Sequence, residues 1–172
     1  MRKVAILGIF LGLFCLSAVA AESDHPKAEF FGGYQYTRIE GGVNANGFDF
    51  AFNGNLNDWF GVTADIGAAY KSQDGVSFNN YTYTFGPQIS LRANKAYTPF
   101  VHALIGGDHA SASYGGASGS GNGMAVLAGG GVDININKNM AFRGAADWML
   151  LHGNGSTSSK NFRFPVGIVF KF

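Results

Sequence analysis

The feature that most constrains this chain is the strict alternation of apolar residues over its last positions, 161–172. Every second residue there is apolar, at Phe162, Phe164, Val166, Ile168, Phe170 and Phe172. Successive side chains of a β-strand point to opposite faces, so this pattern predicts a strand with one continuous apolar face. A bare apolar strand is a template for aggregation, so we expect protein or lipid to cover this face.

The same two-residue period recurs along the chain after Pro26, where no window longer than a few residues shows helical periodicity. In the segment 98–108, both the odd-numbered and the even-numbered positions (the two parities) carry apolar residues. His102 and Asp108 indicate that the even-numbered positions form the polar face. The period defines eight segments, at 27–38, 47–54, 59–71, 80–92, 98–108, 124–136, 140–151 and 161–172.

The connections between these segments alternate in length. Three are short turns, at 55–58, 93–97 and 137–139, and four are longer and rich in Gly, Ser and Asn, at 40–46, 72–79, 109–123 and 152–160. The longest contains a low-complexity stretch, 111–123, which we expect to be a flexible loop. Short turns at one end and long loops at the other are typical of an outer-membrane barrel. Both chain ends then lie at the short-turn end.

The apolar parity is too bulky for the inside of such a barrel. Eight strands enclose a space just wide enough for side chains to fill it, and this parity holds most of the 16 Phe together with Tyr and Trp. The other parity is mainly Gly, Ala, Ser and Thr with isolated charges, so we expect Ile66 to face lipid and Thr63 to face the lumen. A soluble lipid-binding barrel is the weaker alternative.

The first 20 residues are expected to be a cleaved signal peptide. Arg2 and Lys3 precede an apolar run at 4–16, and small residues at 18–20 form a cleavage site. The run is shorter than the roughly 20 residues of a membrane-spanning helix. The remaining 21–172 are predicted to form one domain, an eight-stranded antiparallel up-and-down transmembrane β-barrel. Its only cysteine, Cys15, lies in the leader.

Five stretches carry a resemblance to a known family. The sequence resembles the small eight-stranded OmpA-type outer-membrane barrels, a resemblance that covers essentially the whole chain after the leader. It implies a Gram-negative outer membrane, with lipid and lipopolysaccharide as surroundings and a monomeric state. The stretches are FFGGYQYTR at 30–38, FGPQISLR at 85–92, TPFVHALIGG at 98–107, MAVLAGGGVDI at 124–134 and GIVFKF at 167–172.

In that family, a terminal Phe preceded by alternating apolar residues is similar to the signal read by the barrel-assembly machinery. The resemblance therefore implies that the last segment is an assembly signal as well as part of the wall. The residues concerned are Phe164, Val166, Ile168, Phe170 and Phe172.

The inner parity also collects charged residues that we expect to form a network across the lumen. Asp133 and Arg143 each lie five positions from Lys138 at the centre of a short turn, so they should face each other on neighbouring strands. Side chains that bridge so narrow a lumen predict a plugged barrel without an open pore. The predicted network comprises Asp65, Arg92, Asp133, Arg143, Asp147 and Arg163.

Catalytic, metal and nucleic-acid functions find little support. His109 and Ser111 suggest a nucleophile and base, but the His-x-Ser-Asn pattern of the serine lipid-A deacylases is not met at Ala112, and only Asp108 stands near as an acidic partner. The four histidines lack metal-ligand spacing, and the net charge of +1 gives no basic footprint for nucleic acid. We expect no enzyme, cofactor, metal or nucleic-acid partner.

The function predicted from the sequence is that of an integral outer-membrane barrel with a structural, membrane-integrity role. One alternative is a surface binding or adhesion protein that acts through its long loops, although the longest loop offers only Tyr114 as an aromatic anchor. A second alternative is a lipid-modifying outer-membrane enzyme, for which no triad is visible.

Overall fold

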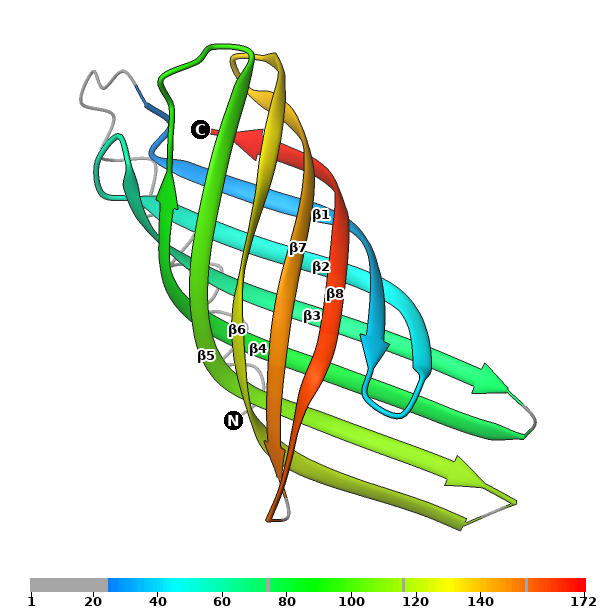
Figure 1. The fold of residues 1–172 in the computed structure, drawn as a ribbon. Coiled ribbons are helices and arrows are strands. Elements are labelled where there is room, and N and C mark those ends of the chain that lie inside the picture. Colours follow the sequence, from blue (N-terminus) through cyan, green and yellow to red (C-terminus); the bar gives the residue numbers. More distant parts are fainter. Residues whose placement is uncertain (1–24, 74, 116, 154) are drawn as a thin grey trace, which may run out of the picture.

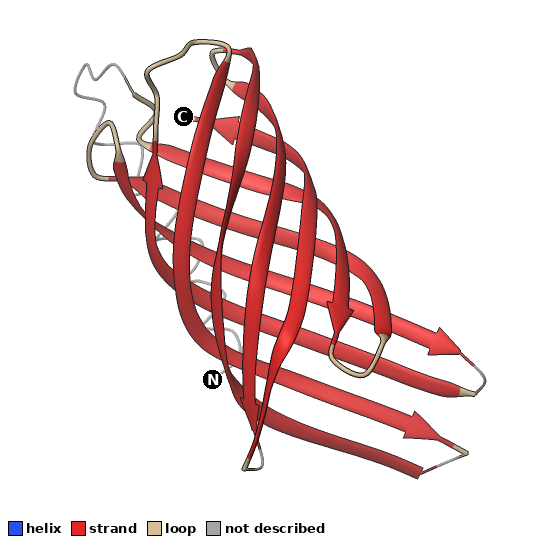
Figure 2. Cartoon of the chain, viewed as in Figure 1, coloured by secondary structure: helices blue, strands red, loops and turns tan. Residues whose placement is uncertain are grey.

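The computed structural model describes residues 25–73, 75–115, 117–153 and 155–172, so the expected signal peptide at 1–20 lies outside the described residues. Figures 1 and 2 show a barrel made of strands joined by turns. Within the described part of the chain, no helix has the length and apolar character to cross a membrane. The strands are β1 (Ala28–Ile39), β2 (Val43–Asn55), β3 (Phe60–Gln73), β4 (Val76–Ser90), β5 (Tyr97–Tyr114), β6 (Ala117–Asn137), β7 (Met140–Gly153) and β8 (Ser156–Lys171).

Each strand pairs antiparallel with its neighbours in the chain, and β8 pairs with β1 to close the barrel. The closing seam runs from Arg38 opposite Phe162 to Glu29 opposite Lys171. At its end the backbone of Phe172 bonds to that of Lys27 and Ala28. The predicted eight-stranded up-and-down barrel is confirmed, and both ends of the wall lie at the end with the connections at 56–59, 91–96 and 138–139.

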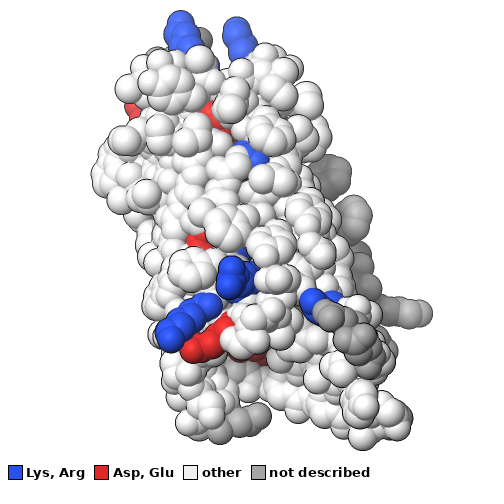
Figure 3. Space-filling view, turned by 45° about the vertical axis from the view of Figure 1, so that its right-hand side comes forward, with Lys and Arg blue, Asp and Glu red and all other residues white. Residues whose placement is uncertain are grey.

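The aromatic parity faces outward and the polar parity faces inward, as predicted. On β3, 58% of Ile66 is exposed against 2% of Thr63. Outward Phe85 and Val101 are also more than half exposed, whereas inward Asp133 is buried. Figure 3 shows that uncharged side chains cover most of the middle of one face. An exposed apolar band of this kind is the surface that lipid covers in membrane barrels.

The expected long loops are wrong in their extent. The strands at that end are separated only by the short connections 40–42, 74–75, 115–116 and 154–155. The stretch 109–123, expected to be a flexible loop, mostly belongs to the paired strands β5 and β6. Alternating Ser, Ala and Gly offer no bulk that prevents pairing, and glycines with positive φ, such as Gly75 and Gly155, allow tight turns. The low-complexity composition therefore forms a long hairpin.

The β5–β6 hairpin separates from its neighbour on one side. Pairing of β6 with β7 begins only at Met124 opposite His152, while pairing with β5 continues to Tyr114 opposite Ala117. In Figure 1 the β3–β4 and β5–β6 hairpins run out at a slant, away from the β7–β8 hairpin. Outer-membrane barrels have short turns on the periplasmic side and longer segments on the extracellular side. We therefore name the end with the projecting hairpins the outer end and the opposite end the periplasmic end.

Candidate functional site: the lumen and its two ends

The middle of the lumen is built around Arg163 of β8. Its guanidinium donates two hydrogen bonds of 2.8 Å to the carboxylate of Asp65 on β3 and one of 2.6 Å to Asp147 on β7. Asp49 of β2 lies 3.6 Å away, and His102 of β5 bonds Asp147 at 2.8 Å. A buried arginine needs such partners because an unpaired buried charge is costly. One side chain thus links three other strands across the barrel.

A second charged group lies nearer the periplasmic end. Arg143 of β7 donates bonds of 2.6 and 2.8 Å to the two carboxylate oxygens of Asp133, its register partner on β6. This confirms the pair expected from counting around Lys138. The guanidinium also lies 3.7 Å from Glu29 and 4.3 Å from the centre of the Phe100 ring. A cation over an aromatic face gains further stabilisation.

Arg92 differs from its expected position. Strand β4 ends at Ser90, so Arg92 belongs to the connection after it rather than to the strand. Its side chain bends over the periplasmic mouth, with bonds of 2.9 Å to both Glu29 and Asn55 and one of 2.7 Å to the backbone oxygen of Asp58. The chain leaves the sheet two residues earlier than the apolar alternation indicates, yet Arg92 still joins the inward charges through Glu29.

Three members of these groups were absent from the predicted network. Glu29 and Asp49 lie on the polar parity of their strands, and His102 lies on the polar face of β5. The alternation in the sequence therefore already indicated that all three side chains point inward. Lys171, the last residue of β8, also turns inward and bonds Asn135 at 2.7 Å. Their partners come from distant strands, which counting along a single hairpin does not show.

Apolar side chains fill the lumen next to the charged groups, which the expectation of small residues did not include. Leu104, Ala125, Leu127 and Met149 form one buried cluster, against which Leu151 packs. We name these five residues the apolar layer. Phe31 is likewise inside and 2% exposed. The narrow lumen is therefore closed by dense packing as well as by ion pairs.

Cavities remain in and around the part of the lumen that the structure describes. The central cavity has a volume of about 20 Å³ and is lined by residues such as Asp49, Asp65 and His102, which is room for about one water molecule. A cavity of about 340 Å³ opens at the periplasmic end and one of about 360 Å³ at the outer end. We name the last the outer vestibule.

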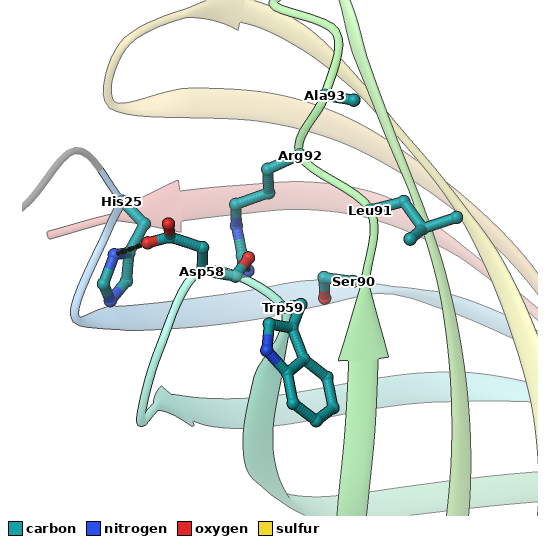
Figure 4. A pocket seen from close by; sticks show the side chains of 7 residues that line it. All are labelled: His25, Asp58, Trp59, Ser90, Leu91, Arg92 and Ala93. Atoms are coloured by element: carbon teal, nitrogen blue, oxygen red, sulfur yellow. Dashed lines mark hydrogen bonds and ion pairs between the residues drawn. The ribbon is translucent and has the colours of Figure 1, made fainter.

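The cavity at the periplasmic end is formed mainly by connections between strands. Figure 4 shows His25 turned toward Asp58, with which it forms an ion pair, and Arg92 reaching toward the same turn. Trp59 lies at one side of the cavity, and Ser90 and Leu91 also line it. This arrangement fastens the start of the barrel to the β2–β3 turn.

The outer rim is held by the turn between β1 and β2. The Glu40 backbone donates to Asn161 at 2.8 Å, and Ser159 donates to the Glu40 carboxylate at 3.2 Å. A hydrogen bond from the Ser158 side chain lowers the pKa of the exposed Glu40 carboxyl. The β1–β2 turn is therefore tied to β8 beyond the point where strand pairing stops.

The acidic residue considered for catalysis points away from the histidine. His109 and Asp108 are consecutive on β5, so their side chains leave opposite faces of the strand. His109 bonds Asn122 at 2.7 Å, whereas Asp108 turns into the outer vestibule. The described residues contain no group of three His, Cys, Asp or Glu that could hold a metal ion.

Fold, apolar belt and polar lumen define a transmembrane β-barrel of the outer-membrane class. The family model for the outer membrane protein beta-barrel domain matches residues 6–172, so the chain belongs to that family, and its location is the outer membrane. No curated protein sequence matches the chain.

Solved structures of bacterial outer-membrane barrels are similar to this chain, among them the following three. Ail, the attachment invasion locus protein of Yersinia pestis, is 19% identical, with a TM-score of 0.64 over 86% of this chain and 99% of that one. Neisserial surface protein A is 15% identical, with a TM-score of 0.66 over 84% and 96%. OprG from Pseudomonas aeruginosa is 12% identical, with a TM-score of 0.63 over 87% and 97%. At these identities the likeness concerns the fold.

Proposed function

We propose that the protein is a closed, non-conducting barrel with a structural role in the outer membrane, and that it has no catalytic activity. The observation that carries this proposal is Arg163, which is 1% exposed and bonded to carboxylates of Asp65 and Asp147 on other strands. Such a group occupies the axis of the barrel instead of lining its wall. Water and ions would have to displace it to pass.

Three further observations support the closed state. The apolar layer separates the outer vestibule from the charged groups, and the central cavity of about 20 Å³ is large enough for only about one water molecule. Arg143 and Asp133 add a second barrier nearer the periplasmic end. Barrels of eight strands have interiors that side chains can fill, in contrast to the channels of 16-stranded porins.

Conductance across planar bilayers tests this proposal. Purified folded protein is expected to give no steady ohmic current, with a 16-stranded porin reconstituted in the same way as the positive control. A stable, reproducible pore in the unmodified protein, insensitive to replacement of Arg143 or Arg163, would overturn both the plug and the structural role.

A second candidate function, surface binding or adhesion, is favoured by the projecting β5–β6 hairpin. Residues of β6 before Met124 pair with β5 only, which leaves a strand edge that another chain can extend. The similar barrel Ail is described as an attachment invasion locus protein, and it has also been solved in complex with the heparin analogue sucrose octasulfate.

Trimming the hairpin tests this second function. Ser111 is paired with Ser120 and Ala112 with Gly119, so removal of these four residues preserves both register and parity. Bacteria that display the trimmed barrel should adhere less to host-cell monolayers than bacteria that display the full barrel at equal surface density. Equal adhesion would remove the hairpin from consideration.

A further inference from the structure

The outer vestibule has the size and the lining of a small-molecule site. Its volume of about 360 Å³ lies within the range of ligand pockets. Asn80 and Asp108 line it on the inner faces of β4 and β5, and Phe78 and Leu151 supply apolar walls. Hydroxyl-bearing residues such as Ser158 lie toward the opening. The apolar layer lies beneath it, because Leu151 belongs to both.

Asp108 is the one group in this lining whose charge is not balanced nearby. The residue is 6% exposed, and its Oδ2 accepts only a long hydrogen bond of 3.4 Å from Asn80. Its Oδ1 has no hydrogen-bond partner, and no cation among the described residues forms an ion pair with it. The adjacent His109 is bonded to Asn122 on the opposite face. Buried carboxylates normally have a partner, since an unpaired charge is costly.

A glycine in the wall gives this carboxylate the room that it occupies. A Cβ atom at Gly123 of β6 would lie 2.4 Å from Asp108 Oδ1, closer than any real contact allows. The oxygen without a partner therefore faces a position where the wall carries no side chain. Because Oδ1 is packed against this wall and closed to solvent, a donor group from the vestibule would reach the carboxylate on its Oδ2 side, where Asn80 makes only a long bond.

We infer that the outer vestibule binds a small organic cation, with its ammonium group on Asp108 and its apolar body against Phe78 and Leu151. The carboxylate supplies charge and a strong acceptor, because hydrogen bonds to charged groups are roughly twice as strong as neutral ones. The apolar walls favour a hydrocarbon body over a bare metal ion. The closed lumen beneath means that the ligand binds from the outer side and is not passed through.

Phenethylammonium chloride serves as the probe, titrated against folded protein in detergent micelles while amide chemical shifts of Gly123 and Leu151 are followed by NMR. We expect saturable shifts. Two partial analogues, ethylammonium without the ring and 2-phenylethanol without the charge, should each bind about tenfold more weakly or worse. The Asp108→Asn variant should lose affinity for phenethylammonium to the same degree. Asp58→Asn, at the periplasmic end, is the matched control and should bind as the unmodified protein does.

Two further variants keep the test informative if Asp108→Asn does not fold. Gly123→Ala retains the carboxylate but displaces it from its position, because the new Cβ would collide with Oδ1. Phe78→Ala removes part of the apolar wall. Each variant should therefore weaken phenethylammonium binding. Unchanged affinity in the folded Gly123→Ala and Phe78→Ala variants would overturn the inference. Equal binding of 2-phenylethanol would overturn it as well. Saturation by calcium chloride with none by phenethylammonium would make the vestibule an inorganic cation site and reject the organic ligand.

Discussion

At the scale of single residues, each lumen arginine holds more than one carboxylate in place. Arg143 binds Asp133 through two bonds and lies close to Glu29, while its guanidinium stacks on Phe100. Removing it leaves buried negative charge without its partner. Removing the pair together leaves no such unpaired charge, because Glu29 keeps its bond to Arg92.

The double replacement of Arg143 and Asp133 should therefore be less damaging than the single one. Arg143→Ala should lower the free energy of unfolding by about 3–5 kcal/mol, the usual cost of breaking a buried pair. Arg143→Met with Asp133→Leu should lose less, since it removes the uncompensated charge and retains a side chain over Phe100. Urea unfolding in micelles measures both. A double variant less stable than Arg143→Ala would contradict this account of the pair.

Gly129 is a second lumen position at which the neighbouring atoms leave no room for a side chain larger than that of glycine. A Cβ there would lie 2.1 Å from Asp147 Oδ1 and 2.4 Å from the backbone oxygen of Ala146. Gly129→Ala should therefore displace Asp147 from its partners His102 and Arg163 and cost about 1–3 kcal/mol through overpacking. Gly144→Ala on β7 is the control, because nothing lies within 4 Å of its Cβ position. Thermal unfolding in micelles compares the two variants. Equal midpoint temperatures would mean that the barrel wall accommodates the added methyl group at Gly129 without loss of stability.

At the scale of the strand, β3 tests which face meets lipid. Ile66 faces outward, with 58% of it exposed, whereas Leu56 is exposed in the turn before β3. Ile66→Arg should cost about 2–4 kcal/mol and Leu56→Arg about 0–1 kcal/mol, because the penalty for a charge falls toward the membrane surface. Unfolding from lipid vesicles measures both values. Similar costs at the two positions would place Ile66 outside the hydrocarbon.

A change in the last strand, β8, can distinguish its role in the barrel wall from its expected role as an assembly signal. The backbone of Phe172 bonds to Lys27 and Ala28, while its ring is 73% exposed. Phe172→Ala keeps those bonds and removes the ring, so folding in detergent should change little. If the ring is part of the assembly signal, the membrane-inserted fraction in cells should fall severalfold. Phe162→Ala, at the far end of β8, is the control, and equal yields for both variants in cells would remove the signal from Phe172.

The positions of the strands, and the side of the wall that each side chain faces, could be predicted from the sequence because both depend on a local period of two residues. Connection length could not, since the Ser, Ala and Gly of 109–123 suit a loop and a strand equally. The structure pairs Ser111 with Ser120 and Ser113 with Ser118. Pairing with a neighbouring strand decides between the two states, and propensity does not contain that information.

At the scale of the whole molecule, the same distinction applies to the lumen. Asp133 and Arg143 face each other across one short turn, so counting from Lys138 predicts their pairing. Arg163 and Asp65 lie 98 positions apart and meet only because β8 closes on β1. A charge pattern can therefore indicate that inward charges exist, whereas barrel closure determines which of them pair.

Closure also predicts how the whole barrel responds to a change in chain order. The ends of the wall are adjacent, since Phe172 bonds to Lys27 and Ala28, and the β5–β6 turn lies at an exposed tip. Circular permutation succeeds at such sites. A variant that starts at Ala117, joins Phe172 to His25 and ends at Gly115 should fold in detergent with nearly unchanged stability, because every strand keeps both neighbours.

In cells, placed behind residues 1–24, this permuted chain should insert poorly if Phe172 must be terminal to act as an assembly signal. Adding a second copy of 161–172 after Gly115 should then raise the inserted fraction without changing stability in detergent. The boiled and unboiled protein compared on gels reports folding, and fractionation reports insertion. Failure to fold in detergent would show that chain order matters to the barrel itself. Normal insertion of the permuted chain without the added copy would show that the last strand is a wall alone.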